Sequence, residues 1–203
     1  MNSAHIARPQ LWILRHGETE WSKSGQYTGL TDLPLTVEGE QQAVEARKVL
    51  EGVDFDLVLT SPLRRARRTA ELAGFPDAVH EPLAVEWDYG DYEGISSDLI
   101  RKDNPDYLIW THGVPNGEAL QDVAARADKI VGRVLESGLD NVLIVAHGHF
   151  SRILTARWLG LDAHEGRKRG DGQLPSASQS NHFPNLLFCS AAAPDNGPVQ
   201  RAP

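Results

Sequence analysis

Short apolar runs alternate with longer amphipathic segments along most of the chain. The first run covers residues 11–14 and stops at Gly17, a second covers residues 57–59, and NVLIVAH at residues 141–147 is the clearest strand of the sequence. Parallel strands need long crossover connections, which are usually helices. The alternation therefore predicts an α/β fold with a largely parallel sheet.

The segments between these runs have the spacing of polar and apolar residues that is typical of helices. Thr36 is expected to cap the first helix, and Pro62 is placed in the first turn of the second. Helices that connect parallel strands cover both faces of a sheet, so we expect a three-layer α/β/α arrangement. The helices are predicted over residues 39–50, 62–73, 118–137 and 150–159.

Two regions depart from this pattern. About residues 87–117 hold tyrosines and tryptophans among glycines, prolines and acids, and we interpret them as an insertion or lid folded over a site. From about Gly166 the pattern weakens. There LLFCSAA, residues 186–192, is compatible with one strand, and residues 193–203 have the composition of a disordered segment.

Length and composition narrow the class of protein. With 203 residues we expect a single domain, residues 1–203, whose core spans about 10–160. The net charge of −8 argues against a nucleic-acid partner, so any anion site must be local. Cys189 is the only cysteine, which excludes an internal disulfide. MNSAHIARPQ lacks the pattern of a signal peptide, and no run approaches the ~18 apolar residues of a membrane span. We therefore expect a cytoplasmic protein with no membrane partner.

Polar, titratable residues follow all three predicted strands. If the strands are neighbours, these residues meet at the carboxyl edge of the sheet, where ligands bind in open α/β folds. Arginine offers a planar fork of donors that matches phosphate oxygens, and a neutral imidazole beside it is a suitable nucleophile. The residues are Arg15 and His16 after the first strand, Ser61, Arg64 and Arg65 after the second, and His147 and His149 after the third.

Each of these residues has an ordinary structural interpretation as well. A lone arginine after a strand is usually solvated, and for Arg67 and Arg68 we favour that interpretation. His147 and His149 could form a metal pair, but we give that interpretation less weight. The coincidence at three strand ends is what favours a phosphate site.

Five stretches carry a resemblance to a known family. They are LRHGETEW, YTGLTDLPLTVEGEQQA, TSPLRRARRTA, EWDYGDYEG and VAHGHFSR, which cover roughly residues 10–160. In this order they resemble the histidine phosphatase superfamily, in its phosphoglycerate-mutase-like branch. The resemblance implies that His16 is phosphorylated, that Arg15 and Arg65 bind the phosphoryl oxygens, and that His147 completes the pocket. It also implies that Glu86, in an E-x-x-x-G pattern, is the general acid.

The resemblance assigns further substrate-binding positions. Thr28 and Gly29 fall where the family closes over the phosphate, Ser22 takes a position that is asparagine in many relatives, and Gly148 belongs to the late HG motif. No metal or other cofactor is required, because guanidinium groups supply the positive charge.

The resemblance favours a phosphatase over the related mutases. The mutases carry an extra segment between the acid and the second HG motif, whereas residues 104–120 are compact here. We therefore expect a metal-independent phosphatase whose partner is a small-molecule phosphate ester, and a homodimer is compatible with the sequence. The alternatives are a phosphoglycerate mutase, a non-catalytic phosphate-binding module, and a metallohydrolase that uses His16, His147 and His149.

Overall fold

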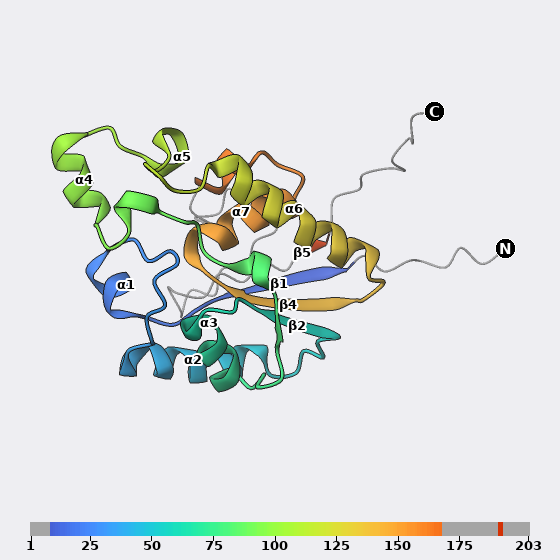
Figure 1. Cartoon of the computed structure of the whole chain (residues 1–203). Helices are drawn as coiled ribbons and strands as arrows, with labels where there is room; N and C mark the ends of the chain where they lie inside the picture. The colour runs from blue at the N-terminus through green and yellow to red at the C-terminus, as the bar shows by residue number, and fades with distance from the viewer. Residues whose placement is uncertain (1–8, 168–190, 193–203) are drawn as a thin grey trace, which may run out of the picture.

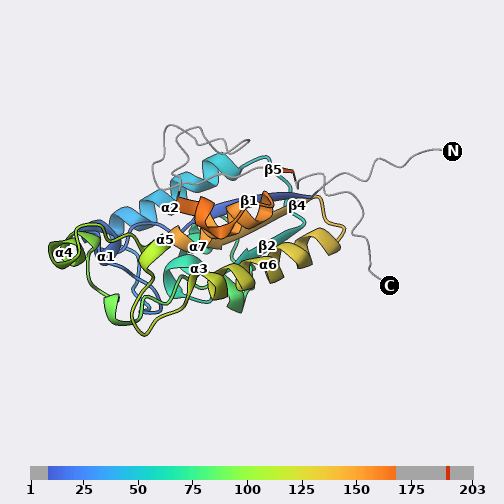
Figure 2. The same cartoon turned by 90° about the horizontal axis from the view of Figure 1, so that it is seen from above.

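The computed structural model describes residues 9–167 and 191–192, and within them a five-stranded sheet lies between two layers of helices (Figures 1 and 2). The strand order is β3-β2-β4-β1-β5. β1 pairs in parallel with β4, β4 with β2, and β2 with β3, whereas β5 pairs antiparallel with β1. The largely parallel sheet is thus confirmed. The strands are β1 (Gln10–Arg15), β2 (Leu57–Thr60), β3 (Val79–His80), β4 (Asn141–Ala146) and β5 (Ala191–Ala192).

Two pairs of helices cover the sheet, one pair on each face. α2 (Val37–Leu50) and α3 (Arg64–Leu72) lie on one side, and α6 (Leu120–Glu136) and α7 (Gly148–Trp158) on the other (Figure 1). The residues of the central strand β4 alternate between two apolar cores, because successive side chains of a strand point to opposite faces. Val142, Ile144 and Ala146 face the α6–α7 side, whereas Leu143 and Val145 face the α2–α3 side. The three-layer prediction is confirmed.

The smaller elements gather beyond the carboxyl end of β1. α1 (Glu20–Ser24) and α4 (Ser97–Asp103) lie at that end of the molecule in Figure 1. The Tyr27 N–H donates to the Ile95 carbonyl at 3.0 Å, which ties the loop after α1 to the segment before α4. The remaining elements are α5 (Ile109–His112) and the 3₁₀ helices Pro82–Ala84, Gly90–Tyr92 and Ala163–Arg167.

Most predicted boundaries agree with the structure, and two are corrected. The Thr36 hydroxyl accepts the Gly39 N–H at 3.0 Å, so Thr36 caps α2 as predicted. Pro62 lies before α3 rather than in its first turn, because Leu63 is extended and the Asp32 carboxylate accepts the Arg64 N–H at 2.7 Å. His147 is the N-cap of α7 and not the last residue of the strand.

Residues 87–117 contribute side chains to the main apolar core. Trp87, Tyr89, Tyr107 and Trp110 are all buried in it. The inner side of this segment is therefore part of the core of the domain. The strand expected over residues 186–192 is described only at β5, and the other expectations for residues 168–190 and 193–203 lie outside the described part of the chain.

No helix among residues 9–167 and 191–192 combines the length and the apolar character needed to cross a membrane.

Candidate active site

The sheet brings together the three groups of polar residues that follow its strands. β1, β4 and β2 are neighbours and run parallel, so the residues after them lie at one edge. The His16 and His147 rings are 5.1 Å apart between centroids. The predicted convergence of histidines and arginines is present in the structure. We refer to Arg15, His16, Arg65 and His147 as the floor of the site.

The His16 ring is neutral and has one nitrogen free. Its Nδ1 lies 2.7 Å from the Gly17 carbonyl oxygen, and since a carbonyl can only accept, Nδ1 carries the proton. Burial lowers the pKa of His16 well below its ordinary value, and the charges of Arg65 and Arg15 lower this pKa further. The Nε2 atom therefore keeps its lone pair over the working pH range, as a nucleophile requires.

The Arg65 guanidinium is buried and holds the loop of residues 28–31. Its Nη2 donates to the carbonyls of Thr28 at 3.1 Å and Gly29 at 2.7 Å, and Nη1 donates to that of Thr31 at 2.9 Å. The Arg65 Nε donates to His147 Nδ1 at 3.2 Å. Arg65 thus brings Thr28 and Gly29 to the site through their main chain. It places a permanent positive charge there as well.

His147 has a fixed tautomer. Because its Nδ1 accepts from Arg65, its proton is on Nε2, which lies 2.8 Å from the Ser61 hydroxyl oxygen. Burial lowers the pKa of His147 well below its ordinary value, and Arg65 and His16 add to this effect. His147 is therefore a neutral hydrogen-bond donor held by residues on both sides.

Arg15 differs from Arg65 in having an unused donor. Its Nε is buried and has no hydrogen-bond partner among the described residues. A Cβ at position 148 would lie 3.4 Å from this nitrogen, so Gly148 leaves the guanidinium room at the start of α7. A buried donor without a partner is costly unless a ligand uses it. This geometry fits an anion beside His16.

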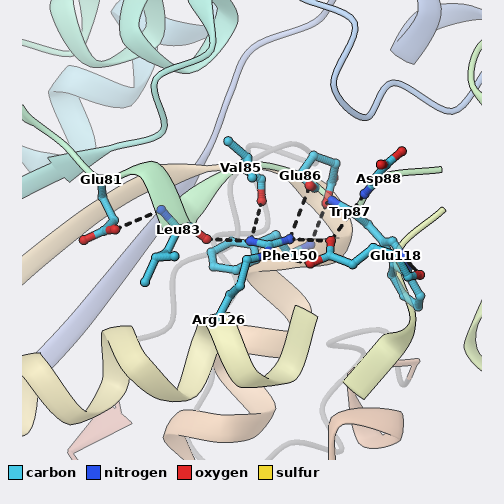
Figure 3. A network of polar contacts seen from close by, with 9 residues as sticks. All are labelled: Glu81, Leu83, Val85, Glu86, Trp87, Asp88, Glu118, Arg126 and Phe150. Atoms are coloured by element: carbon cyan, nitrogen blue, oxygen red, sulfur yellow. Dashed lines mark hydrogen bonds and ion pairs between the residues drawn. The ribbon is translucent and has the colours of Figure 1, made fainter. Parts of the chain in front are cut away.

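Glu86 lies against the N-terminus of α7 (Figure 3). Its Oε1 accepts the N–H groups of Trp87 at 2.9 Å and Phe150 at 2.8 Å, and its Oε2 accepts that of His149 at 3.0 Å. A carboxylate offers about four lone-pair positions, so Oε2 keeps one that these contacts do not fill. Oε2 is therefore the carboxylate oxygen with room for a further hydrogen bond.

Glu93 is a functional candidate that sequence reasoning missed. Its carboxylate accepts the N–H of Gly29 at 2.9 and 3.0 Å and that of Thr31 at 3.1 Å. The 28–31 loop is thus held by Arg65 through its carbonyls and by Glu93 through its N–H groups. Glu93 stands in the quoted stretch EWDYGDYEG, directly before Gly94, and this carboxylate in a motif of the family was the signal that could have identified it.

Ser22 has another role in the structure. Its hydroxyl donates to the Thr19 carbonyl at 3.0 Å and accepts the Thr19 N–H at 2.8 Å. The Thr19 N–H contact, together with the Ser22 N–H that donates to the Thr19 hydroxyl at 3.2 Å, forms a capping box at the start of α1. The structure therefore engages the Ser22 hydroxyl within its own helix rather than with the floor of the site.

The arrangement of histidines gives the metallohydrolase alternative no structural support. In the part of the chain that the structure describes, no three His, Cys, Asp or Glu side chains are grouped so that they could hold a metal ion. The ring nitrogens of His147 face Arg65 and Ser61, and His149 Nδ1 lies 2.7 Å from the Tyr89 hydroxyl. Burial lowers the pKa of His149 to about 3, and Arg152 and Arg15 add to this effect.

The fold and the site together describe a class of protein: an α/β domain that holds two arginines beside a neutral histidine at the carboxyl edge of its parallel sheet. A family model described as the histidine phosphatase superfamily (branch 1) matches residues 11–178. The chain belongs to this superfamily, as its sequence motifs predicted.

Individual relatives have different activities in their names. An acid phosphatase from Mycobacterium tuberculosis is 44% identical over 176 residues, which are 85% of each chain. A 2,3-bisphosphoglycerate-dependent phosphoglycerate mutase from Bartonella bacilliformis is 36% identical over 177 residues, 78% of this chain and 85% of the mutase. A solved structure of an open reading frame product from M. tuberculosis has a TM-score of 0.76 at 39% identity and covers 91% of this chain and 98% of that one.

Proposed function

We propose that the chain is a phosphatase that hydrolyses small phosphate monoesters in the cytoplasm, without a metal, through a phosphohistidine on His16. The observation that carries the proposal is the neutral His16 ring with its Nε2 unprotonated, close to the charges of Arg15 and Arg65. The name of the M. tuberculosis relative, an acid phosphatase, supports the same class of reaction.

In the first step, His16 Nε2 attacks the phosphorus atom and the bond to the ester oxygen breaks. The developing charge on the equatorial oxygens is stabilised by the positive charges of Arg15 and Arg65, and His147 holds Arg65 in place through its Nδ1. The leaving oxygen takes the proton from Glu86 Oε2 and departs as an alcohol.

In the second step, a water molecule attacks the phosphohistidine and Glu86 accepts one of its protons. The bond between phosphorus and Nε2 breaks, which returns the free imidazole and inorganic phosphate. Glu86 is protonated again and ready for the next ester.

His16→Ala tests the nucleophile. We expect hydrolysis to fall to the uncatalysed background while the melting temperature changes little, because the only hydrogen bond that His16 makes through its side chain in the described structure is to its neighbour Gly17. Rapid quench of the wild type should trap an acid-labile, base-stable phosphoryl label that the variant lacks. His80→Ala, an exposed histidine on β3, is the matched control and should keep full activity. Retained activity in His16→Ala would overturn the proposal.

A substrate panel separates the proposal from its alternatives. We expect hydrolysis of alkyl, sugar and aryl phosphates that persists in excess EDTA. With 3-phosphoglycerate, release of inorganic phosphate supports a phosphatase, whereas conversion to 2-phosphoglycerate would favour the mutase suggested by the Bartonella relative. Activity lost with EDTA and restored by zinc or manganese would favour the metallohydrolase.

A further inference from the structure

The segment that leads to Glu86 has little regular structure of its own. It runs from Glu81 through the short 3₁₀ helix Pro82–Ala84. Arg126 of α6 binds the part of the segment next to Glu86 (Figure 3), whereas Arg133 pairs with Glu81 at its start. Arg126 donates from Nη1 to the carbonyls of Leu83 and Val85, and from Nη2 to that of Glu86 at 3.4 Å. A single guanidinium thus bonds three carbonyls of the segment, the last of which belongs to Glu86 itself.

Glu118 holds the same arginine in place. Its carboxylate accepts from Arg126 Nε at 2.7 Å and from Nη2 at 2.8 Å, a two-point pairing that fixes the plane of the guanidinium. The Glu118 main chain and the residues that follow Glu86 are also hydrogen-bonded. Its carbonyl accepts the Trp87 indole N–H at 2.7 Å, and its N–H donates to the Asp88 carbonyl at 3.0 Å.

Arg126 also packs against Phe150, whose N–H binds the Glu86 carboxylate. Its guanidinium carbon lies 5.1 Å from the centre of the Phe150 ring, and the Phe150 N–H is one of the donors to Glu86 Oε1. Arg126 therefore contacts Glu86 from two directions, through the main chain before it and through the residue that binds its side chain.

We propose that Arg126, locked by Glu118, is a positioning residue that sets the place of the Glu86 carboxylate for proton transfer. This inference rests on the proposed function, because it assigns Arg126 to the general acid of that reaction. Arg126 makes no hydrogen bond or ion pair with the floor in the described structure, and its charge adds only the smallest of the effects that lower the pKa of His147, so it acts mainly through Glu86. The pair is largely withdrawn from water, with side-chain exposures of 14% for Arg126 and 18% for Glu118.

Arg133 provides a matched control on the same helix. It lies two turns further along α6 and pairs with Glu81 at 2.6 Å, at the far end of the segment. Its side chain is 57% exposed, and this ion pair does not involve Glu86. Arg133→Met removes the same charge from the same face of the helix without touching the residues next to the acid.

The decisive experiment compares two esters in single-turnover formation of the phosphoenzyme. An alkyl phosphate needs a proton on its leaving oxygen, whereas p-nitrophenyl phosphate leaves as a stable phenolate. For Arg126→Met we expect the alkyl ester to slow about tenfold or more, since a small displacement of a catalytic group has effects of this order, and the aryl ester to slow by less than about threefold. Arg133→Met should change neither rate.

Two further variants keep the inference testable if Arg126→Met is unstable. Arg126→Lys keeps a charge beside Glu118 but cannot reproduce the planar fork to three carbonyls, so it should show the same alkyl-selective loss. Glu118→Gln keeps an acceptor for Arg126, so it should show the same alkyl selectivity with a smaller loss than Arg126→Met. A Glu118→Gln loss as large as that of Glu86→Gln would instead make Glu118 the acid and overturn the inference.

Combination with Glu86→Gln separates this inference from the proposed function. If Arg126 acts through Glu86, then Arg126→Met should add almost no further loss to the alkyl reaction once the acid is removed. Independent, multiplying losses, or equal slowing of both esters by Arg126→Met, would overturn the positioning role. Absence of any phosphoenzyme in the wild type, or a Glu86→Gln variant without ester selectivity, would instead overturn the proposed function.

Discussion

The floor of the site and the segment that carries Glu86 are built in opposite ways. Arg15 is the last residue of β1, His16 and His147 follow β1 and β4 directly, and Arg65 lies in the first turn of α3 after β2. Their positions therefore depend mainly on the register of neighbouring parallel strands. The segment of residues 81–90 contains only short 3₁₀ turns, and its place depends on α6 and on the N-terminus of α7. The positive side of the site is therefore fixed by the sheet, and the acidic side by contacts between distant side chains.

The two regions also differ in whether the residue that carries the charge is the one that fixes the position of that charge. In the floor, the buried Arg65 and the partly buried Arg15 carry the charge, and their own backbone positions next to the sheet determine where that charge lies. On the acidic side, Glu86 carries the charge while Arg126 and Glu118 determine where it lies. Substitutions in the floor should therefore affect all esters alike, and substitutions around Glu86 should discriminate between leaving groups.

The two floor arginines give the largest expected effects. Arg15→Ala and Arg65→Ala should each lower kcat/KM by about 10²–10³-fold for alkyl and aryl esters alike, because each removes a positive charge beside the transferred phosphoryl group. Only Arg65→Ala should also destabilise the fold, by about 1–3 kcal/mol or more, since it leaves the buried carbonyls of the 28–31 loop without their donor. Steady-state kinetics and urea unfolding measure the two effects.

Arg67→Ala is the control for both variants, because Arg67 is exposed on α3 two residues after Arg65. Its activity and its free energy of unfolding should stay close to those of the wild type. If Arg15→Ala destabilised the protein as much as Arg65→Ala, the contrast between a free and an engaged guanidinium would be wrong.

The strand pattern of the sequence could predict the floor of the site but not the residues around Glu86. Arg15, His16 and His147 each stand beside a strong apolar run, so the strand pattern alone placed them at one edge of the sheet. Glu86 was placed only by the resemblance of its motif, because no apolar run positions it. Arg126 and Glu118 lie 40 and 32 residues further along the chain than Glu86, and a helix pattern cannot tell which face of α6 meets the 81–86 segment. The Ser22 hydroxyl was assigned to substrate by its motif, whereas the local capping box at Thr19 uses it.

The histidines near the floor should make stability depend on pH. The pKa values of His16 and His147 are lowered well below the ordinary value of 6.5 by burial and by the arginines, and burial lowers that of His149 to about 3. Below pH 6.5 the unfolded chain therefore takes up protons that the folded chain does not. The contribution of these neutral histidines to the free energy of unfolding should be complete above pH 6.5. Below that pH, the free energy of unfolding should fall by up to about 1.4 kcal/mol per pH unit for each histidine.

Urea unfolding at pH 7.5, 6.5 and 5.5 measures this slope. His16→Gln removes one of the three groups, so its slope between pH 6.5 and 5.5 should be shallower than that of the wild type by about one proton. Equal slopes in the two proteins would show that His16 takes up a proton in the folded state as readily as in the unfolded one, and the neutral nucleophile would lose its basis.

The smallest expected effect concerns two buried serines that differ in their partners. The Ser61 hydroxyl oxygen lies 2.8 Å from His147 Nε2 and fixes the ring from the side opposite Arg65, whereas the Ser151 hydroxyl is buried on α7 with no hydrogen-bond partner among the described residues. Ser61→Ala leaves the Nε2–H of His147 without its acceptor and frees the ring to turn. We expect kcat to fall about three- to tenfold and stability to fall by about 1 kcal/mol, the usual contribution of one buried hydrogen bond.

Ser151→Ala removes a hydroxyl of the same size that pairs with nothing there, so activity should be unchanged and the free energy of unfolding equal or slightly higher. Equal losses in the two variants would mean that cavity formation, and not the orientation of His147, causes the effect at Ser61.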